Sequence, residues 1–248
     1  MAIKNIQTAH LIHDLKNPVN IIETGARSLL EKQDRYGALN SKQDKVVRRM
    51  LRNALKIRCL INSMLEIDKA AMGLINHGES TLSQILKTSL VEVFDLVDPS
   101  VSEALEDARN LEKFRSVLQA HHVILEADDS QLCRTIWTDE IKLCLIITNL
   151  LSNAFKYKSR DVFVRCVVDG DTVSVQVRDD GPGIPECYHE QIFSQYFQCL
   201  KVEGFPVRGH GLGLAGAQAL AEALGGELSL SRCSQGAEFL VRVKSAPK

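Results

Sequence analysis

The stretch TNLLSNAFKY, residues 148–157, combines a packing surface with a polar stripe on one predicted helix. The stripe is made of Asn149, Asn153, Lys156 and Tyr157. These positions are four, three and one residues apart, so they share one helix face, whereas the leucines between them serve the packing sides. The helix is expected to begin after Thr138 or Asp139, either of which can cap its first amides. A solvated face is the ordinary explanation of one such stripe, so the neighbouring motifs decide whether it faces a ligand.

Two glycine-rich motifs follow this helix. RDDGPGIP, residues 178–185, comes directly after a predicted strand. Its Gly181 and Gly183 let the backbone turn tightly and approach a ligand, and Asp179 can accept a hydrogen bond from the exocyclic amine of a base. GHGLGLAGAQAL, residues 209–220, is a loop that runs into a helix N-terminus, where free amides and the helix dipole favour phosphate. Each motif alone could be a turn, but the three in this order predict a site for a nucleotide.

The C-terminal part of the chain alternates between strand and helix patterns. Strands are expected at residues 121–127, in a hairpin over residues 161–181 with an Asp-Gly turn, and at residues 227–231 and 237–243; a helix is expected over residues 211–226. Residues 80–118 read as helical, with a break at Pro99, and no role is predicted for them. This segregation predicts an α+β fold in which helices cover one face of a sheet.

The N-terminal part predicts a helical hairpin. One helix is expected from Ile3 to Glu31, a polar connection over residues 32–44, and a second helix that ends near residue 72. Both helices carry apolar residues at spacings of three and four, and two such helices cannot bury both stripes against each other. A four-helix bundle made by two chains would bury them, so we expect a homodimer.

The composition sets limits on the partners. The chain has 248 residues, enough for two domains, and its 30 basic residues nearly balance 31 acidic ones, so no nucleic acid is expected as a partner. No apolar run is long enough to span a bilayer, so this segment is expected to make no membrane contact. Seven cysteines, an odd number without a CxxC pair, read as reduced thiols of a cytoplasmic protein.

The motifs together resemble those of one protein family. NLLSNAFKY, DDGPGIP, IFSQYF and GHGLGL resemble the successive nucleotide-binding boxes of the histidine-kinase catalytic domain, a member of the Bergerat-fold (GHKL) ATPases. HDLKNP, residues 13–18, resembles the phosphoacceptor box of the same kinases. The resemblance implies a dimerisation and phosphoacceptor domain over residues 1–77 and a catalytic ATP-binding α/β sandwich over residues 78–248.

The resemblance also implies roles for residues of the phosphoacceptor box. His13 would be the nucleophile that attacks the γ-phosphorus of ATP, and the adjacent Asp14 would take the proton from its other ring nitrogen. Asn17, four residues after His13, matches the position that orients water for dephosphorylation of the receiver. Pro18 lacks the amide that would bond the carbonyl of Asp14, so a kink and local mobility are expected beside the histidine.

In the catalytic domain the resemblance implies a site for ATP and Mg²⁺. Asn153 would hold the metal, Asn149 would support it, and Lys156 would neutralise phosphate oxygens. Tyr157 would lie along the adenine pocket, and Asp179 would accept from the adenine amine. The other implied positions are Gly181 and Gly183 near the base, and Gly209, Gly211, Leu212 and Gly213 at the lid end and phosphate loop.

The implied partners are a response-regulator receiver domain, whose aspartate accepts the phosphoryl group, and a sensor domain upstream. The protein would be cytoplasmic, or the cytoplasmic part of a membrane-bound kinase. Two alternatives stay open. A non-kinase Bergerat ATPase would use the same pocket for hydrolysis alone. A phosphotransfer scaffold with an impaired nucleotide site is the second, because His210 replaces a small residue and residues 198–210 form a short lid.

Overall fold

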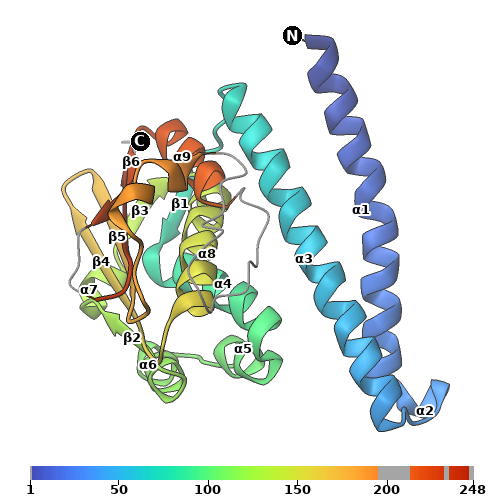
Figure 1. The fold of residues 1–248 in the computed structure, drawn as a ribbon. Coiled ribbons are helices and arrows are strands. Elements are labelled where there is room, and N and C mark those ends of the chain that lie inside the picture. Colours follow the sequence, from blue (N-terminus) through green and yellow to red (C-terminus); the bar gives the residue numbers. More distant parts are fainter. Residues whose placement is uncertain (1, 195–212, 232–234, 246–248) are drawn as a thin grey trace. The chain divides into compact units, whose positions relative to one another are not determined.

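The computed structural model describes residues 2–194, 213–231 and 235–245, with the side chains of its first helix from Leu15 onward (Figure 1). Residue contacts divide the chain into two compact units, Met1–Asp68 and Lys69–Lys248. The long helix α3 runs across this division. The predicted domain boundary between residues 77 and 78 stays a prediction.

The first unit is the expected helical hairpin. Its helices are α1 (Ala2–Glu31), the short α2 (Gln33–Tyr36) and α3 (Ser41–Ala71), and α1 contains Pro18. The predicted connection over residues 32–44 was too long. It contains α2, and α3 already begins at Ser41, because Asn40 Oδ1 accepts hydrogen bonds from the amides of Lys42 and Gln43, both at 3.0 Å.

The hairpin is held by a small apolar core and one ionic cluster. The core consists of buried Val19, Ala54 and Ile61, with Leu65 packed against them. Glu23, only 7% exposed, lies 2.7 Å from the guanidinium of Arg58 and 3.1 Å from that of Arg27. The Arg58 contact joins α1 to α3, so it fixes the register of the two helices.

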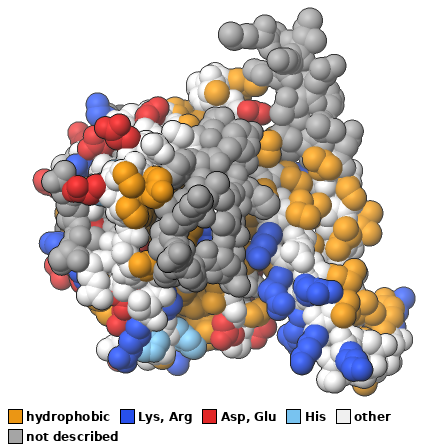
Figure 2. Space-filling model, in the orientation of Figure 1, with side chains coloured by type: hydrophobic (Ala, Val, Ile, Leu, Met, Phe, Trp, Pro, Cys, Tyr) orange, Lys and Arg blue, Asp and Glu red, His pale blue; other side chains and the backbone are white. Residues whose placement is uncertain are grey.

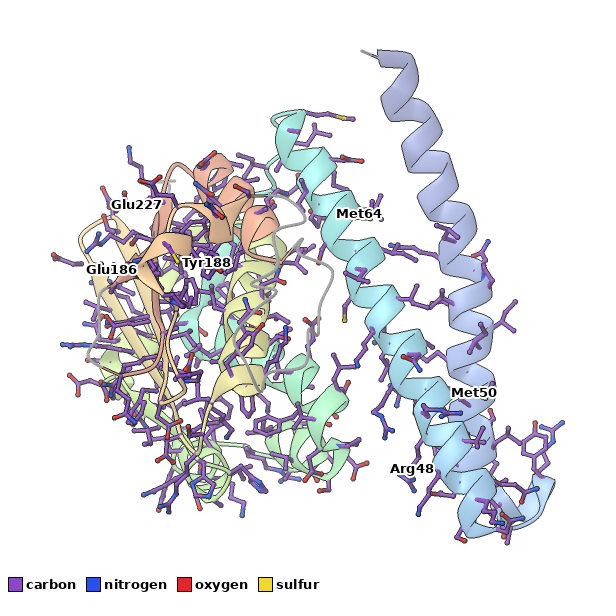
Figure 3. All side chains as sticks on the ribbon, in the orientation of Figure 1. Arg48, Met50, Met64, Glu186, Tyr188 and Glu227 are labelled. Atoms are coloured by element: carbon purple, nitrogen blue, oxygen red, sulfur yellow. The ribbon has the colours of Figure 1, made fainter. Side chains whose placement is uncertain are left out.

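The hairpin also leaves large apolar side chains in solvent. Those at least 44% exposed on α1 and α3 are Leu15, Ile21, Ile22, Val46, Met50, Ile57 and Met64. Met50, Ile57 and Met64 recur at intervals of seven, and Figure 3 shows Met50 and Met64 on α3. Hydrophobic side chains gather along these helices in the space-filling view (Figure 2). A heptad stripe of this kind is typical of a helix that packs against another chain.

The second unit is built on a five-stranded sheet. Its strand order is β2-β4-β5-β7-β6, with β2 parallel to β4 and the other pairs antiparallel. The strands are β2 (Val123–Glu126), β4 (Val162–Asp169), β5 (Thr172–Asp179), β6 (Glu227–Ser231) and β7 (Glu238–Lys244). Alternate residues of β4 and β5 are buried, so one face of the sheet carries the core. This confirms the predicted hairpin and the single covered face.

Helices cover that face (Figure 1). They are α4 (Leu82–Val97), α5 (Pro99–Glu106), α6 (Leu111–Ala120), α7 (Asp129–Leu132), α8 (Glu140–Tyr157) and α9 (Gly213–Ala223), and two 3₁₀ turns lie at Glu186–Tyr188 and Gln191–Phe193. Helix α8 packs against α4, α9 and β5. Residues 80–118, which had no predicted role, thus supply α4, which packs against α8, together with α5, which packs against α4, and α6, which packs against β2.

A second, two-stranded sheet was not predicted. Strands β1 (Gly78–Thr81) and β3 (Thr135–Thr138) pair antiparallel, so residues more than 50 positions apart meet. Thr81 then begins α4 through a capping box, because its hydroxyl accepts from the amide of Gln84 and its own amide donates to the Gln84 side chain. Asp98 caps α5 with Pro99 in the first turn, which confirms the predicted break.

Candidate nucleotide site

The N-terminus of α8 is fixed by a buried ion pair. Asp139 caps the helix by accepting from the amide of Lys142, and the Lys142 ammonium lies 2.7 Å from Asp139 Oδ2. The amide of Asn76 donates to the same oxygen at 2.9 Å. Burial alone would raise the pKa of Asp139, but the hydrogen bonds from Lys142 and Asn76 outweigh it and lower that pKa. Both residues are nearly inaccessible to solvent, so the start of α8 is rigidly anchored.

The polar stripe of α8 lies at the opposite end of the helix. Asn149 Nδ2 donates to the carbonyl of Leu145 at 2.9 Å, which aims Oδ1 away from its own helix. A Cβ added to Gly213, the first residue of α9, would lie 3.0 Å from that oxygen. Asn153 is half-buried. The polar stripe of α8 therefore faces the start of α9. This agrees with the prediction that the stripe and the glycine-rich loop belong to one site.

The last turn of α8 carries the remaining stripe residues. Lys156 and Tyr157 are exposed, and the Lys156 ammonium lies 4.5 Å from the centre of the Tyr157 ring. A cation over an aromatic face at this distance is attracted by the electron-rich ring. The ammonium and the ring thus lie together at the end of the helix where the glycine turn approaches.

Asp179 ends β5 as a buried carboxylate, only 4% exposed. Its Oδ1 accepts from the amide of Gly181 at 2.9 Å and from that of Ala237 at 3.4 Å. Burial raises the pKa of Asp179 above its ordinary value despite these bonds. A buried acid with one oxygen fixed by backbone amides can present its other oxygen to a ligand.

The glycines of the turn are required by close backbone packing. A Cβ at Gly181 would lie 2.2 Å from the carbonyl oxygen of Tyr157, so the turn rests directly on the end of α8. Gly183 adopts φ +77° and faces the carbonyl of Gly236. A Cβ at Gly236 would lie 1.8 Å from the Asp179 carbonyl oxygen. Gly236 was not predicted, because a single glycine before a strand is typical of an ordinary turn.

Several predicted site residues lie outside the part of the chain that the structure describes. Gly209, Gly211 and Leu212 are outside the described residues, as are His210 and the lid over residues 198–210. His13 and Asp14 lie in α1, but their side chains are outside the described part. Asn17 is exposed on the same helix. The structure therefore brings together the stripe of α8, the turn after Asp179 and Gly213.

The described residues fit a nucleotide better than a metal held by protein alone. Gly181 and Gly236 let the turn pack directly against the backbone of Tyr157 and Asp179, and the buried carboxylate of Asp179 lies at this turn. Within residues 15–194, 213–231 and 235–245, no three His, Cys, Asp or Glu side chains are grouped so that they could hold a metal ion. Mg²⁺ is commonly bound by few protein groups together with phosphates, and an amide oxygen such as that of Asn153 is a suitable ligand.

No helix in the part of the chain that the structure describes is both long and apolar enough to cross a membrane.

Comparison with known proteins agrees with the division of the chain into two units. Residues 3–73 match the family model of the His Kinase A (phospho-acceptor) domain. Residues 138–247 match that of the histidine kinase-, DNA gyrase B- and HSP90-like ATPases. The class of protein is therefore an ATPase-type domain joined to a phosphoacceptor hairpin.

Individual relatives give the same result. The chain is 28% identical to hybrid signal transduction histidine kinase D of Dictyostelium discoideum, over 96% of this chain and 14% of that protein. It is 27% identical to the aerobic respiration control sensor protein ArcB of Escherichia coli, over 93% of this chain and 27% of that protein. The crystal structure of full-length ShkA in complex with AMPPNP superposes with a TM-score of 0.61 at 23% identity, covering 98% of this chain and 46% of ShkA.

The chain belongs to the sensor histidine kinases. It spans less than a third of the length of the two curated relatives, and less than half of ShkA.

Proposed function

We propose that the second unit binds ATP and that its γ-phosphoryl group is transferred to His13 of the first unit. From there it would pass to an aspartate of a response-regulator receiver domain. The observation that supports this most strongly is the convergence of three separate segments. The turn at Gly181 rests on the end of α8, and Gly213 at the start of α9 faces Asn149.

Each polar group of the site has a role that suits its position. Asp179 would accept from the adenine amine, because its two amide donors among the described residues both reach Oδ1. Asn149 and Asn153 would offer amide oxygens on the phosphate side, and Lys156 would neutralise phosphate charge. Mg²⁺, when bound through Asn153 and the phosphates, would offset the charge that gathers on the transferred group.

The phosphoacceptor box supplies the nucleophile. A neutral His13 nitrogen would form a bond to the γ-phosphorus as the bond from phosphorus to the bridging oxygen breaks, and ADP would leave. Asp14 would accept the proton of the other ring nitrogen, so that the phosphorylated imidazole is left neutral. Asn17, exposed on the same helix, would later orient water for removal of phosphate from the receiver.

The exposed apolar stripe supports a homodimer. Among the described residues, seven large apolar side chains on α1 and α3 are exposed in one chain, and a second hairpin would cover them. The relatives are much longer than this chain, which supports a sensor domain and a receiver domain as further parts of the signalling pathway. We place the kinase reaction in the cytoplasm, where ATP and reduced thiols are found.

One incubation separates this function from its alternatives. Wild-type protein is mixed with γ-labelled ATP and Mg²⁺, and label on the protein, ATP turnover and nucleotide binding are measured together. Acid-labile label on the protein supports the kinase. Steady turnover without label would favour a non-kinase ATPase, and absence of nucleotide binding would favour a phosphotransfer scaffold.

A further inference from the structure

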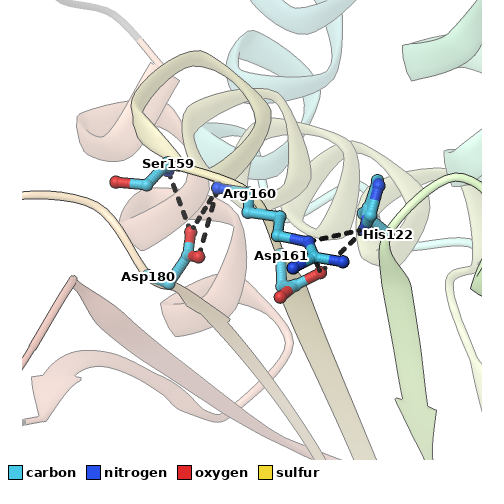
Figure 4. Close-up of polar contacts among 5 residues, drawn as sticks. All are labelled: His122, Ser159, Arg160, Asp161 and Asp180. Carbon is cyan, nitrogen blue, oxygen red and sulfur yellow. Dashed lines mark hydrogen bonds and ion pairs between the residues drawn. The ribbon is translucent and has the colours of Figure 1, made fainter.

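The loop between α8 and β4, residues 158–161, is held by the carboxylate of Asp180. The amide of Ser159 donates to Asp180 Oδ1 at 2.9 Å, and the amide of Arg160 donates to Oδ1 at 2.9 Å and to Oδ2 at 3.1 Å (Figure 4). These bonds span about twenty residues of sequence, from the end of α8 to the turn after β5. Successive amides that converge on one carboxylate form an anion-binding nest.

The charge state of Asp180 agrees with this arrangement. Burial would raise the pKa of its carboxyl, but the backbone amides of Arg160, Asp161 and Ser159 outweigh it and hold the pKa below its ordinary value. The carboxylate is therefore ionised at neutral pH, when its hydrogen bonds to the amides are strongest.

Asp179 and Asp180 are adjacent in sequence but accept hydrogen bonds from different segments of the chain. Asp179 is buried at the end of β5 and accepts from the amide of Gly181, within the turn itself. Asp180 instead reaches the loop after Tyr157. The backbone of Gly181 rests on the Tyr157 carbonyl, so the turn touches α8 at the residue where the loop held by Asp180 begins.

The loop is also held at its far end. Asp161 Oδ1 lies 3.0 Å from His122 Nδ1 (Figure 4). The amide of Val162 also donates to the carbonyl of His122 at 2.9 Å. His122 itself has φ +62°, a left-handed conformation that is uncommon outside glycine. The far end of the loop is thus fixed beside β2, and Val162 is paired with Asp179 in the sheet, whereas Asp180 holds the middle of the loop at Ser159 and Arg160.

We infer that Asp180 is a positioning residue for nucleotide binding: it ties the loop after α8 to the turn that carries Asp179. These hydrogen bonds keep the polar stripe of α8 and the carboxylate of Asp179 at the separation that one bound nucleotide requires. Asp180 does not itself touch the nucleotide. The inference rests on the proposed ATP site.

The test compares three variants of the full chain. In Asp180→Ala both acceptor oxygens are lost, whereas Asp180→Asn keeps one oxygen for the amides of Ser159 and Arg160. Asp171→Ala, in the exposed turn at the opposite end of β5, is the matched control. Binding of ATP with Mg²⁺ is measured by calorimetry, and KM and kcat are measured by autophosphorylation. Hydrogen exchange of the amides of Ser159 and Arg160 is measured without nucleotide.

Asp180→Ala should raise Kd and KM for ATP about tenfold, because ATP binding must then order a loop that has lost its charge-assisted hydrogen bonds, while kcat at saturating ATP stays within about twofold. Its amides at Ser159 and Arg160 should exchange faster than in the wild type. Asp180→Asn should recover most of the affinity, and Asp171→Ala should match the wild type.

Two failures are distinguishable. If the wild type binds no ATP, the proposed function fails before any variant is considered. If the wild type binds ATP and Asp180→Ala binds it equally well, the positioning role is wrong, even where the variant unfolds at a lower temperature. An equal fall in kcat and rise in KM would also overturn it, because a general loss of folded protein does not act on ATP affinity alone.

Discussion

Asp179→Asn should weaken ATP binding without disturbing the fold. Among the described residues, the amides of Gly181 and Ala237 both donate to Asp179 Oδ1. An asparagine can keep its Oδ1 in this place, so its Nδ2 takes the position of the second carboxylate oxygen. That nitrogen is a donor, and it would face the donor amine of adenine.

The size of the effect follows from one lost hydrogen bond to a charged acceptor. Such a loss amounts to about 1–3 kcal/mol, which is a rise of about 5- to 150-fold in Kd. Calorimetry with ATP and Mg²⁺ measures it directly. Asp169→Asn, at the end of β4 and exposed, is the matched control and should bind as the wild type does.

The same variant has a predictable effect on stability. Burial raises the pKa of Asp179, so the ionised carboxylate costs the folded state free energy at neutral pH. This cost is removed as the pH falls through the raised folded-state pKa, where the folded protein takes up the proton. Without nucleotide, the asparagine variant should therefore be at least as stable as the wild type at neutral pH, and its advantage should shrink on acidification.

Denaturant unfolding at neutral and at mildly acidic pH measures this difference. Unchanged ATP affinity would show that the adenine amine does not meet Asp179. An asparagine variant less stable than the wild type at neutral pH would contradict the assignment of burial as the dominant influence on this carboxyl.

Three further predictions concern other parts of the chain. Gly181→Ala should cost about 1–3 kcal/mol of folding free energy in denaturant unfolding, because its Cβ would lie 2.2 Å from a backbone oxygen; an unchanged midpoint would contradict this packing. Ile57→Asp should convert a two-chain species to single chains in sedimentation, whereas Ile124→Asp on the sheet should not; dimers of both variants would argue against the stripe. Asn17→Ala should keep autophosphorylation and slow dephosphorylation of the receiver, and equal loss of both would assign Asn17 a structural role in α1.

Features encoded by residues close in sequence could be predicted. The start of α8 follows from Asp139, whose side chain caps the helix, and the break before α5 follows from Pro99. The hairpin of β4 and β5 follows from alternating valines around the turn at Gly170, which has φ +56°. The common face of Asn149 and the stripe residues follows from helical periodicity alone.

Features that depend on distant residues could not be predicted in this way. Strands β1 and β3 have four residues each, too few for a periodic signal. Each strand forms by pairing with the other, which lies more than 50 residues away in sequence. Gly236 is required by the carbonyl of Asp179, which lies far away in sequence. The buried pair of Asp139 and Lys142 did have a signal, an acidic cap followed three residues later by a lysine, but that spacing also fits an exposed pair.

The label on His13 tests the central claim most directly. Wild type, His13→Gln and His10→Gln are incubated with γ-labelled ATP and Mg²⁺, and ATP binding is measured for each. We expect label on the wild type and on His10→Gln that is lost in acid and kept in base, as for a phosphoramidate, and no label on His13→Gln although it still binds ATP. Acid-labile label that persists on His13→Gln would place the acceptor elsewhere and contradict the account.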